Sequence, residues 1–216
     1  LYLSLGDAFV PGSAAHPDSL AGKILRLDPE GGVPDDNPFP GSPVYALGLR
    51  NPQGLAWEPS TGALFAPDHG PTDWPWEGGR RDHDELNEIR PGADYGWPSA
   101  AGRSEAGSAQ PLVDWTPAIA PSGAAFYTGA YAPWRGQLFV GALRGRHLRR
   151  IRLGRIAGAW RVLEEEPVVA DSSHGRIRGV FMGADGHLYL TTSNRVTGPA
   201  RVPDDLLLRL RLPGEP

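Results

Sequence analysis

A short segment in the first quarter of the chain combines a cation with two amides. Arg50, Asn51 and Gln53 stand immediately before an apolar run, residues 54–57, that reads as a strand. Pro52 fixes its own φ and biases the residue before it toward an extended backbone, so the polar groups project from a stiff segment. This arrangement indicates a ligand site at the mouth of a sheet. The alternative is a turn with a surface salt bridge.

Arginine supplies almost all of the positive charge, because Lys23 is the only lysine in the chain. Guanidinium groups are planar and pair well with carboxylates, so several of them in one place would suit a compact polyanion. The candidates are those beside the ends of expected strands: Arg50, Arg144, Arg176 and Arg178. Arginines that alternate along expected strands are instead predicted to face solvent: Arg149, Arg150, Arg152, Arg209 and Arg211.

Two acidic stretches, residues 68–73 and 82–85, concentrate oxygen donors around the turn at Gly70 and Pro71. Ca²⁺ prefers about six to eight oxygens, including backbone carbonyls, so these stretches form a candidate calcium site. Zinc is less favoured, because the histidines lack a close ligand spacing and the chain has no cysteine. The alternative is a solvated acidic loop.

Two aromatic turns, residues 95–98 and 115–123, place Trp or Tyr close to Pro. Rigid aromatic side chains of this kind can wall a site for a sugar or a flat ring. Packing in the core is the favoured interpretation for Trp97.

The composition is typical of a globular protein with many turns. Of the 216 residues, 40% are hydrophobic, and the 29 glycines and 23 prolines are spread along the chain. The net charge of -4 provides no overall field that would attract nucleic acid or an anionic membrane. The absence of cysteine excludes disulfides and thiolate catalysis, and no run approaches the roughly 18 apolar residues that would predict a membrane span.

One pattern recurs four times: a strand with Leu-Tyr or Leu-Phe, a polar turn, and a second strand. The copies are residues 1–7 with 22–28, 63–70 with 84–89, 137–141 with 147–153, and 187–192 with 205–212. The last three copies follow a further strand, at 54–57, 124–127 and 179–182, and hairpin signals occur at 58–62 and 183–186.

Repeats of roughly 40–50 residues with several strands each are the signature of a β-propeller. We therefore predict an all-β fold, with residues 1–216 as a single propeller domain of about three and a half blades. The first copy lacks its leading strand, and the chain begins inside an expected strand. We expect residues upstream of it, and a larger ring.

The motifs together resemble the glucose/sorbosone dehydrogenase family, the soluble aldose sugar dehydrogenases that use pyrroloquinoline quinone (PQQ). They include Arg-Asn-Pro-Gln-Gly at 50–54, His-Gly-Pro at 69–71 and Asp-Glu-Leu-Asn at 84–87. The others lie at residues 20–27, 36–39, 92–98, 121–123, 143–145 and 176–178, in family order over nearly the whole chain.

The resemblance implies a six-bladed propeller with the quinone over its central channel. The residues that would bind the quinone are Arg50, Asn51, Gln53, Arg144, Arg176 and Arg178. Arg50 would also stabilise negative charge on the reduced quinone, and Asp7 resembles an acid that supports the catalytic base. Backbone oxygens of Gly70 and Pro71 would bind Ca²⁺, and Glu85 and Tyr95 resemble positions of a second Ca²⁺ in some members.

The chain departs from the family pattern in three places. The family's catalytic His lies upstream of the position of Leu1, in a segment that this chain lacks, so activity of the chain alone is in question. Leu49 stands where the family usually has His. The loop 72–83, with Trp74 and Trp76, is longer than usual, and these last two departures bear on the substrate.

The leading hypothesis is a PQQ- and Ca²⁺-dependent dehydrogenase that oxidises the C1 hydroxyl of aldose sugars to lactones. Its partners would be a sugar and an electron acceptor, and the resemblance implies a periplasmic or secreted location. The alternative is a non-catalytic propeller that binds carbohydrate or a protein partner. A metal-dependent lactonase is a third option, but Asn51 and Asn194 have no clear acidic partner.

Overall fold

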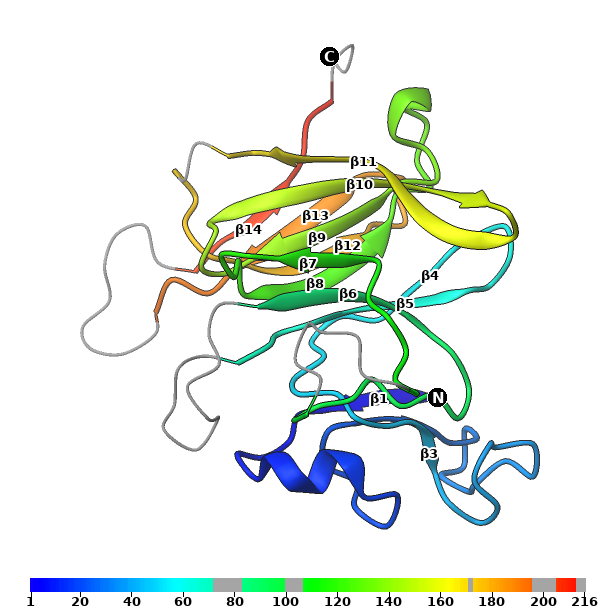
Figure 1. Cartoon of the computed structure of the whole chain (residues 1–216). Helices are drawn as coiled ribbons and strands as arrows, with labels where there is room; N and C mark the ends of the chain where they lie inside the picture. The colour runs from blue at the N-terminus through cyan, green and yellow to red at the C-terminus, as the bar shows by residue number, and fades with distance from the viewer. Residues whose placement is uncertain (72–82, 100–106, 171–172, 196–204, 213–216) are drawn as a thin grey trace. The chain divides into compact units, whose positions relative to one another are not determined.

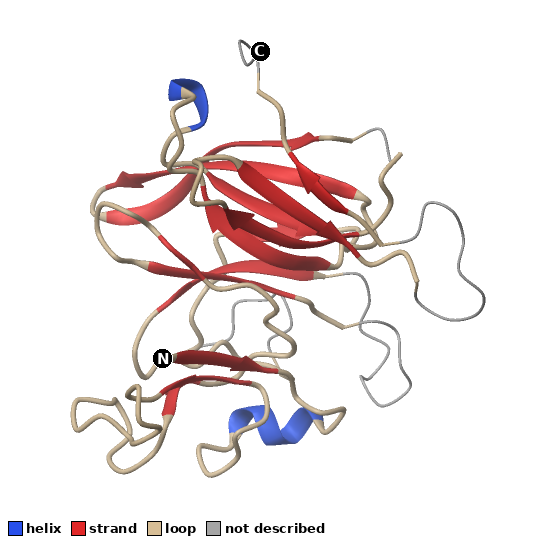
Figure 2. Cartoon of the chain, turned by 180° about the vertical axis from the view of Figure 1, so that it is seen from behind, coloured by secondary structure: helices blue, strands red, loops and turns tan. Residues whose placement is uncertain are grey.

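The structure is a computed structural model that describes residues 1–71, 83–99, 107–170, 173–195 and 205–212. These residues form antiparallel sheets, with two short 3-10 helices, η1 (Pro11–Ala15) and η3 (Ala132–Trp134), and no α-helix among them (Figure 2). The prediction of an all-β fold is confirmed. Within the described ranges no helix has the length and apolar character needed to cross a membrane.

The chain divides into two compact units, which we describe separately. The first comprises Leu1–Gln53 and Leu64–Ala118, and the second Gly54–Ala63 and Ile119–Pro216. The strands of the first unit are β1 (Tyr2–Leu5), β2 (Lys23–Arg26), β3 (Val44–Ala46), β5 (Leu64–Asp68), β6 (Asp84–Ile89) and β7 (Val113–Trp115). The prediction of one propeller domain over the whole chain stays a prediction.

The second unit holds the remaining strands. They are β4 (Ala56–Trp57), β8 (Pro121–Phe126), β9 (Leu138–Ala142), β10 (His147–Ile156), β11 (Ala159–Val168), β12 (Ile177–Met182), β13 (Leu188–Thr192) and β14 (Leu207–Arg209). Figure 1 shows β8 to β10 as neighbours in one sheet and β12 to β14 in another. In all four sheets of the described chain, hydrogen-bonded neighbours follow one another along the sequence, as in the blades of a propeller.

Each unit has its own apolar core. In the first, Leu25, Val44 and Leu47 pack together with Phe39 against them. In the second unit a core joins the sheet of β8–β11 to that of β12–β14 through Tyr127, Phe139, Leu148, Ile177, Val180, Leu188, Leu190 and Leu212. Strands β5 and β9 are buried along their whole length, which places them deepest in their sheets.

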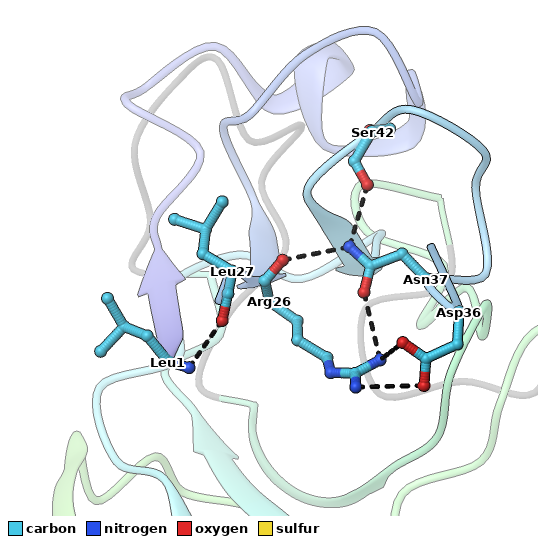
Figure 3. A network of polar contacts seen from close by, with 6 residues as sticks. All are labelled: Leu1, Arg26, Leu27, Asp36, Asn37 and Ser42. Atoms are coloured by element: carbon cyan, nitrogen blue, oxygen red, sulfur yellow. Dashed lines mark hydrogen bonds and ion pairs between the residues drawn. The ribbon is translucent and has the colours of Figure 1, made fainter. Parts of the chain in front are cut away.

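The residues between β2 and β3 are tied down by the side chain of Asn37, which is 7% exposed. Its Nδ2 donates to the backbone oxygens of Arg26 and Ser42, both at 3.0 Å (Figure 3). The guanidinium of Arg26 pairs with both carboxylate oxygens of Asp36, at 2.9 and 3.1 Å. The motif at residues 36–39 therefore stabilises the fold.

All the strands expected from the repeats are present, but three others were missed: β3, β7 and β11. Strand β11 contains three consecutive acids, Glu164 to Glu166, which hide any apolar alternation. Its pairing with β10 explains them, because each acid forms an ion pair with an arginine of β10. The ion pairs are Arg149–Glu165 at 3.2 Å, Arg150–Glu166 at 2.6 Å and Arg152–Glu164 at 2.6 Å.

These pairs correct the prediction that the five alternating arginines all face solvent. Arg209 and Arg211 are exposed, as expected. Arg149 and Arg150 are partly buried, with side chains 18% and 17% exposed. The reason is that the unrecognised strand β11 covers one edge of β10.

The two predicted hairpin signals are turns. At 58–62, the carboxylate of Glu58 accepts hydrogen bonds from the backbone and hydroxyl of both Ser60 and Thr61. At 183–186, the N–H of Gly183 donates to the carbonyl of His187 at 2.8 Å. Gly186 has φ +80°, a backbone conformation that favours glycine.

Candidate functional site

The segment that carries Arg50 and Asn51 is fastened to the end of β5 in the first unit. The carboxylate of Asp68 accepts the backbone N–H of Arg50 at 3.0 Å and that of Asn51 at 2.6 Å. The N–H of His69 donates to the Asn51 carbonyl at 3.2 Å. Because the backbone is held from both sides, the directions in which the two side chains leave it are set by β5.

Asp68 is 5% exposed, so its carboxylate has little water around it. Burial raises the pKa of Asp68 to about 7, and the charge of Glu85, its cross-strand partner on β6, acts in the same direction. The backbone N–H groups of Arg50 and Asn51 act in the opposite direction. Asp68 therefore fixes the backbone by accepting its N–H groups, although burial and the charge of Glu85 disfavour the ionised form of its carboxylate.

The side chain of Arg50 is buried, with the residue 6% exposed. Its Nη1 donates to the backbone carbonyl of His69 at 2.9 Å. Its Cζ lies 5.7 Å from the ring centroid of Trp97, over the indole. This is the geometry of a cation–π contact.

Asp7 adjoins the same residues. Its backbone N–H donates to the Arg50 carbonyl at 2.8 Å. One carboxylate oxygen accepts the indole Nε1–H of Trp97 at 2.9 Å, and the other accepts the N–H of Phe9 at 3.0 Å. Asp7 is 7% exposed, so both bonds lie largely out of water.

A hollow in the first unit collects many of the predicted site residues. It is lined by Gly48, Arg50, Asp68, Gly70, Pro71, His83, Glu85, Tyr95 and Trp97. The structure thus brings together Arg50 and all four residues predicted to bind metal. Three other predicted residues do not line the hollow. Asn51 and Gln53 follow Arg50 closely in the sequence, and Asp7 is hydrogen-bonded to Arg50 and Trp97.

The donors around the hollow are hard oxygens. Gly70 lies against the His83 carbonyl so closely that a Cβ there would be 1.6 Å from that oxygen, which excludes any other residue. The Tyr95 hydroxyl donates to the Glu88 carbonyl at 2.5 Å, and burial raises its pKa to about 12. Tyr95 would therefore offer its carbonyl, and not its hydroxyl, to a cation.

Backbone carbonyls at Gly70 and Pro71 are donors of the kind that one Ca²⁺ takes, and the Glu85 carboxylate with the Tyr95 carbonyl would serve a second. Among the described residues no group of three or more His, Cys, Asp and Glu side chains is suited to a metal ion. Any ion held here would thus depend on backbone oxygens.

The other predicted arginines belong to the second unit. Arg144 follows β9, while Arg176 and Arg178 flank Ile177 at the start of β12. The buried Ser122 hydroxyl lies 3.0 Å from the Gly141 carbonyl and 2.8 Å from that of Ile177, which joins the ends of β9 and β12. The convergence of these arginines with Arg50 stays a prediction, because Arg50 is in the first unit.

Positive charge accumulates around Arg176. Burial lowers the pKa of its guanidinium, and the charges of Arg178 and Arg146 lower it further. Arg146 has φ 51°, an uncommon backbone conformation for a non-glycine residue. Arg146 was not among the arginines predicted from the sequence. Its position two residues after Arg144 could have indicated it.

Sequence reasoning also missed Asp68 as an anchor and assigned Trp97 to the core. Trp97 is indeed buried, at 4% exposed, but it lines the hollow as well. For Asp68, the signal was an acid that ends an otherwise apolar strand. Leu49, which replaces the family's usual His, is fully buried. The long loop lies outside the described residues over 72–82, including Trp74 and Trp76.

Blade-like meanders of antiparallel strands, with arginine-rich and oxygen-rich segments at strand ends, are typical of a β-propeller protein. The family model for glucose/sorbosone dehydrogenase matches residues 1–200. The chain therefore belongs to the glucose/sorbosone dehydrogenase family, and the predictions of family and propeller fold are confirmed.

Similarity to individual proteins supports this family assignment. The chain is 34% identical to the aldose sugar dehydrogenase YliI of Escherichia coli K12, over 89% of this chain and 53% of that protein. A crystal structure from Thermus thermophilus, assigned as a glucose dehydrogenase, superposes with a TM-score of 0.84 at 43% identity, covering 96% of this chain and 61% of the other. The PQQ-bound aldose sugar dehydrogenase of Streptomyces coelicolor gives 0.79 at 36% identity, covering 96% and 57%. The chain spans about half the length of the curated relatives it matches.

Proposed function

We propose that the whole protein oxidises the C1 hydroxyl of aldose sugars to lactones, with PQQ and Ca²⁺ as cofactors. Membership of the family supports a PQQ-dependent sugar oxidoreductase. The observation that carries the proposal is the hollow in which Arg50 meets Gly70, Pro71, Glu85 and Tyr95. Because the chain spans about half of its relatives, the activity is proposed for the protein and not for these residues alone.

The arginines and amides would bind the quinone carboxylates and carbonyls. In the first unit these are Arg50, Asn51 and Gln53, and in the second Arg144, Arg176 and Arg178. A guanidinium offers two parallel N–H donors to a carboxylate, so the arginines would both bind and orient the ring. Arg50 is already held by the His69 carbonyl, and would place positive charge where negative charge develops.

The oxygens of Gly70 and Pro71 would bind one Ca²⁺, and those of Glu85 and Tyr95 a second. When bound, the quinone accepts a hydride and Ca²⁺ increases its electrophilicity. The buried Asp84 accepts the Gly70 N–H at 2.9 Å, which fixes the position of Gly70 at the hollow. Asp7 is proposed to support the residue that removes the sugar's hydroxyl proton.

The protein's other partners follow from the same proposal. A sugar would supply two electrons per turnover, and a separate electron acceptor would remove them. We propose a periplasmic or secreted location, which rests on the family resemblance.

The experiment is a calorimetric titration of the chain with PQQ, with and without Ca²⁺, alongside the quinone absorbance. We expect Ca²⁺-dependent binding that weakens at least tenfold in Arg178→Ala, since a charge-assisted pair is lost. Arg211→Ala, which removes an exposed arginine outside the site, is the matched control. Equal losses in both variants would favour a non-catalytic propeller. Absence of binding to a folded chain would mean either that the rest of the protein is needed to build the site or that the propeller is non-catalytic.

A further inference from the structure

Trp97 contacts two residues that have proposed roles in the site, Asp7 and Arg50. Its indole Nε1 donates to the Asp7 carboxylate at 2.9 Å, and its ring lies under the Arg50 guanidinium, 5.7 Å from Cζ. The three residues Trp97, Asp7 and Arg50 are 4%, 7% and 6% exposed, respectively. All three belong to the first unit, so these contacts lie within one compact body.

The backbone around Trp97 allows the ring little freedom. Its N–H donates to the Gly48 carbonyl at 2.9 Å. Gly48 has φ +73°, and a Cβ there would lie 2.7 Å from the Gly96 nitrogen and 2.9 Å from that of Tyr95. The two segments therefore approach more closely than a side chain at position 48 would permit. The bond from Nε1 to Asp7 then sets the rotation of the indole itself.

A fixed indole has a direct consequence for Arg50. A guanidinium is planar and weakly hydrated, and it stacks well on an aromatic face. The Arg50 side chain thus has an aromatic surface beside it and the His69 carbonyl at Nη1, 2.9 Å away. Its orientation is set before a ligand arrives, which reduces the entropy lost on binding.

We propose that Trp97 is a positioning residue for Arg50, and that Asp7 acts on the site through the Trp97 indole. The proposal rests on the proposed function to the extent that Arg50 binds the quinone. It gives Asp7 a second role, distinct from support of a catalytic base, because one carboxylate oxygen is committed to the indole.

The test is a double-mutant cycle on PQQ affinity with Trp97→Leu, Arg50→Ala and the double variant, measured by calorimetry. We expect Trp97→Leu to weaken binding roughly 3- to 30-fold, the span between an exposed and a desolvated cation–π contact. In the Arg50→Ala background the same change should alter affinity less than about twofold, because the group that Trp97 positions is gone. Equal losses in both backgrounds would overturn the proposal.

Three further variants separate the effect of the Trp97 ring face from that of its hydrogen bond to Asp7. Trp97→Phe keeps an aromatic face but removes the N–H, so its loss should fall between wild type and Trp97→Leu. Asp7→Asn keeps an oxygen that can accept the indole N–H, whereas Asp7→Leu does not. We expect Asp7→Leu to weaken binding only while Trp97 is present, and an undiminished effect in Trp97→Phe would contradict the proposed link. Trp57→Leu, at an exposed tryptophan, is the control for general effects.

A second readout distinguishes failure of this inference from failure of the proposed function. If the wild-type chain does not bind PQQ, these residues alone do not form the proposed quinone site, and the coupling of Trp97 with Arg50 is measured by urea denaturation instead. There we expect the two changes to be coupled about threefold or more in the unfolding equilibrium constant. Additive effects would overturn the positioning role. Should Trp97→Leu not fold, Trp97→Phe completes the cycle in its place.

Discussion

Buried polar side chains organise much of the first unit, and the single lysine is the clearest case. Lys23 is fully buried, and its Nζ donates to the carbonyls of Ser13, Ala14 and Ala21 at 3.0, 2.7 and 2.8 Å. One side chain thus closes the loop that contains η1. Like Asp68 and Asn37, Lys23 satisfies backbone groups that would otherwise lie out of water without partners.

Lys23 should give the stability of the protein a distinct dependence on pH. Burial lowers its pKa from 10.5 to about 8, and the charge of Asp94 opposes this shift. Between pH 8 and 10.5 the unfolded chain keeps a proton that the folded chain has lost, so this group makes the free energy of unfolding rise with pH.

We expect wild type to gain up to roughly 3 kcal/mol relative to Lys23→Met across this window, measured by urea denaturation at several pH values. The comparison with the variant cancels the titration of other groups. Parallel pH profiles for the two proteins would rule out a depressed pKa for Lys23.

Among the elements, the close contact of β8 and β12 depends on a glycine. A Cβ at Gly123 would lie 2.7 Å from the Val180 nitrogen and 2.9 Å from the Arg178 carbonyl. Both are backbone atoms, so the strands would have to separate. The same contact positions Arg178, and hence part of the proposed quinone site.

Gly123→Ala should therefore destabilise the chain by about 1–3 kcal/mol, as overpacking does, and weaken PQQ binding. Thermal denaturation and calorimetry would measure the two effects. Gly12→Ala is the matched control, because nothing lies within 4 Å of a Cβ there, and it should be neutral or slightly stabilising. If Gly123→Ala behaved like the control, the strands would be less tightly packed than the structure indicates.

For the whole molecule, each unit carries large apolar side chains at its surface. In the first, Leu1, Leu3 and Leu5 are 63%, 40% and 39% exposed; Leu3 and Leu5 share one face of β1, and Leu1 directly precedes that strand. In the second, Leu207 and Phe181 are 66% and 43% exposed. Exposed apolar faces of short strands promote association, and the net charge of -4 opposes it only weakly.

The isolated chain should accordingly self-associate at high concentration. We expect the pair Leu3→Thr and Leu207→Thr to reduce this association at least severalfold in sedimentation or light scattering. Threonine keeps the strand preference, so the melting temperature should hardly change. Glu30→Thr, at another exposed site, should leave association unaltered. Unchanged association in the leucine variants would mean that these faces are not the cause.

Local signals in the sequence were sufficient for the strand class and for most of the strand positions. Alternating apolar residues and the Gly and Pro turns are such signals, so the repeats at β1–β2, β5–β6, β9–β10 and β12–β14 could be read directly. The order of the motifs was enough to indicate the family. Strand β11 was not predicted, because its acidic residues are explained only by their ion pairs with arginines on the neighbouring strand β10.

The way the site is held, by contrast, depends on contacts between distant parts of the chain. Gly70 and Tyr95 line one hollow although they lie on separate segments, and Trp97 meets Asp7 across 90 residues. Such contacts produce no periodic pattern in the sequence, because they depend on which strand ends come together in the fold. The roles of the buried side chains of Asp68, Trp97 and Lys23 have the same cause. The hydrogen-bond partner of a charged or polar side chain is decided only when folding removes water from around it.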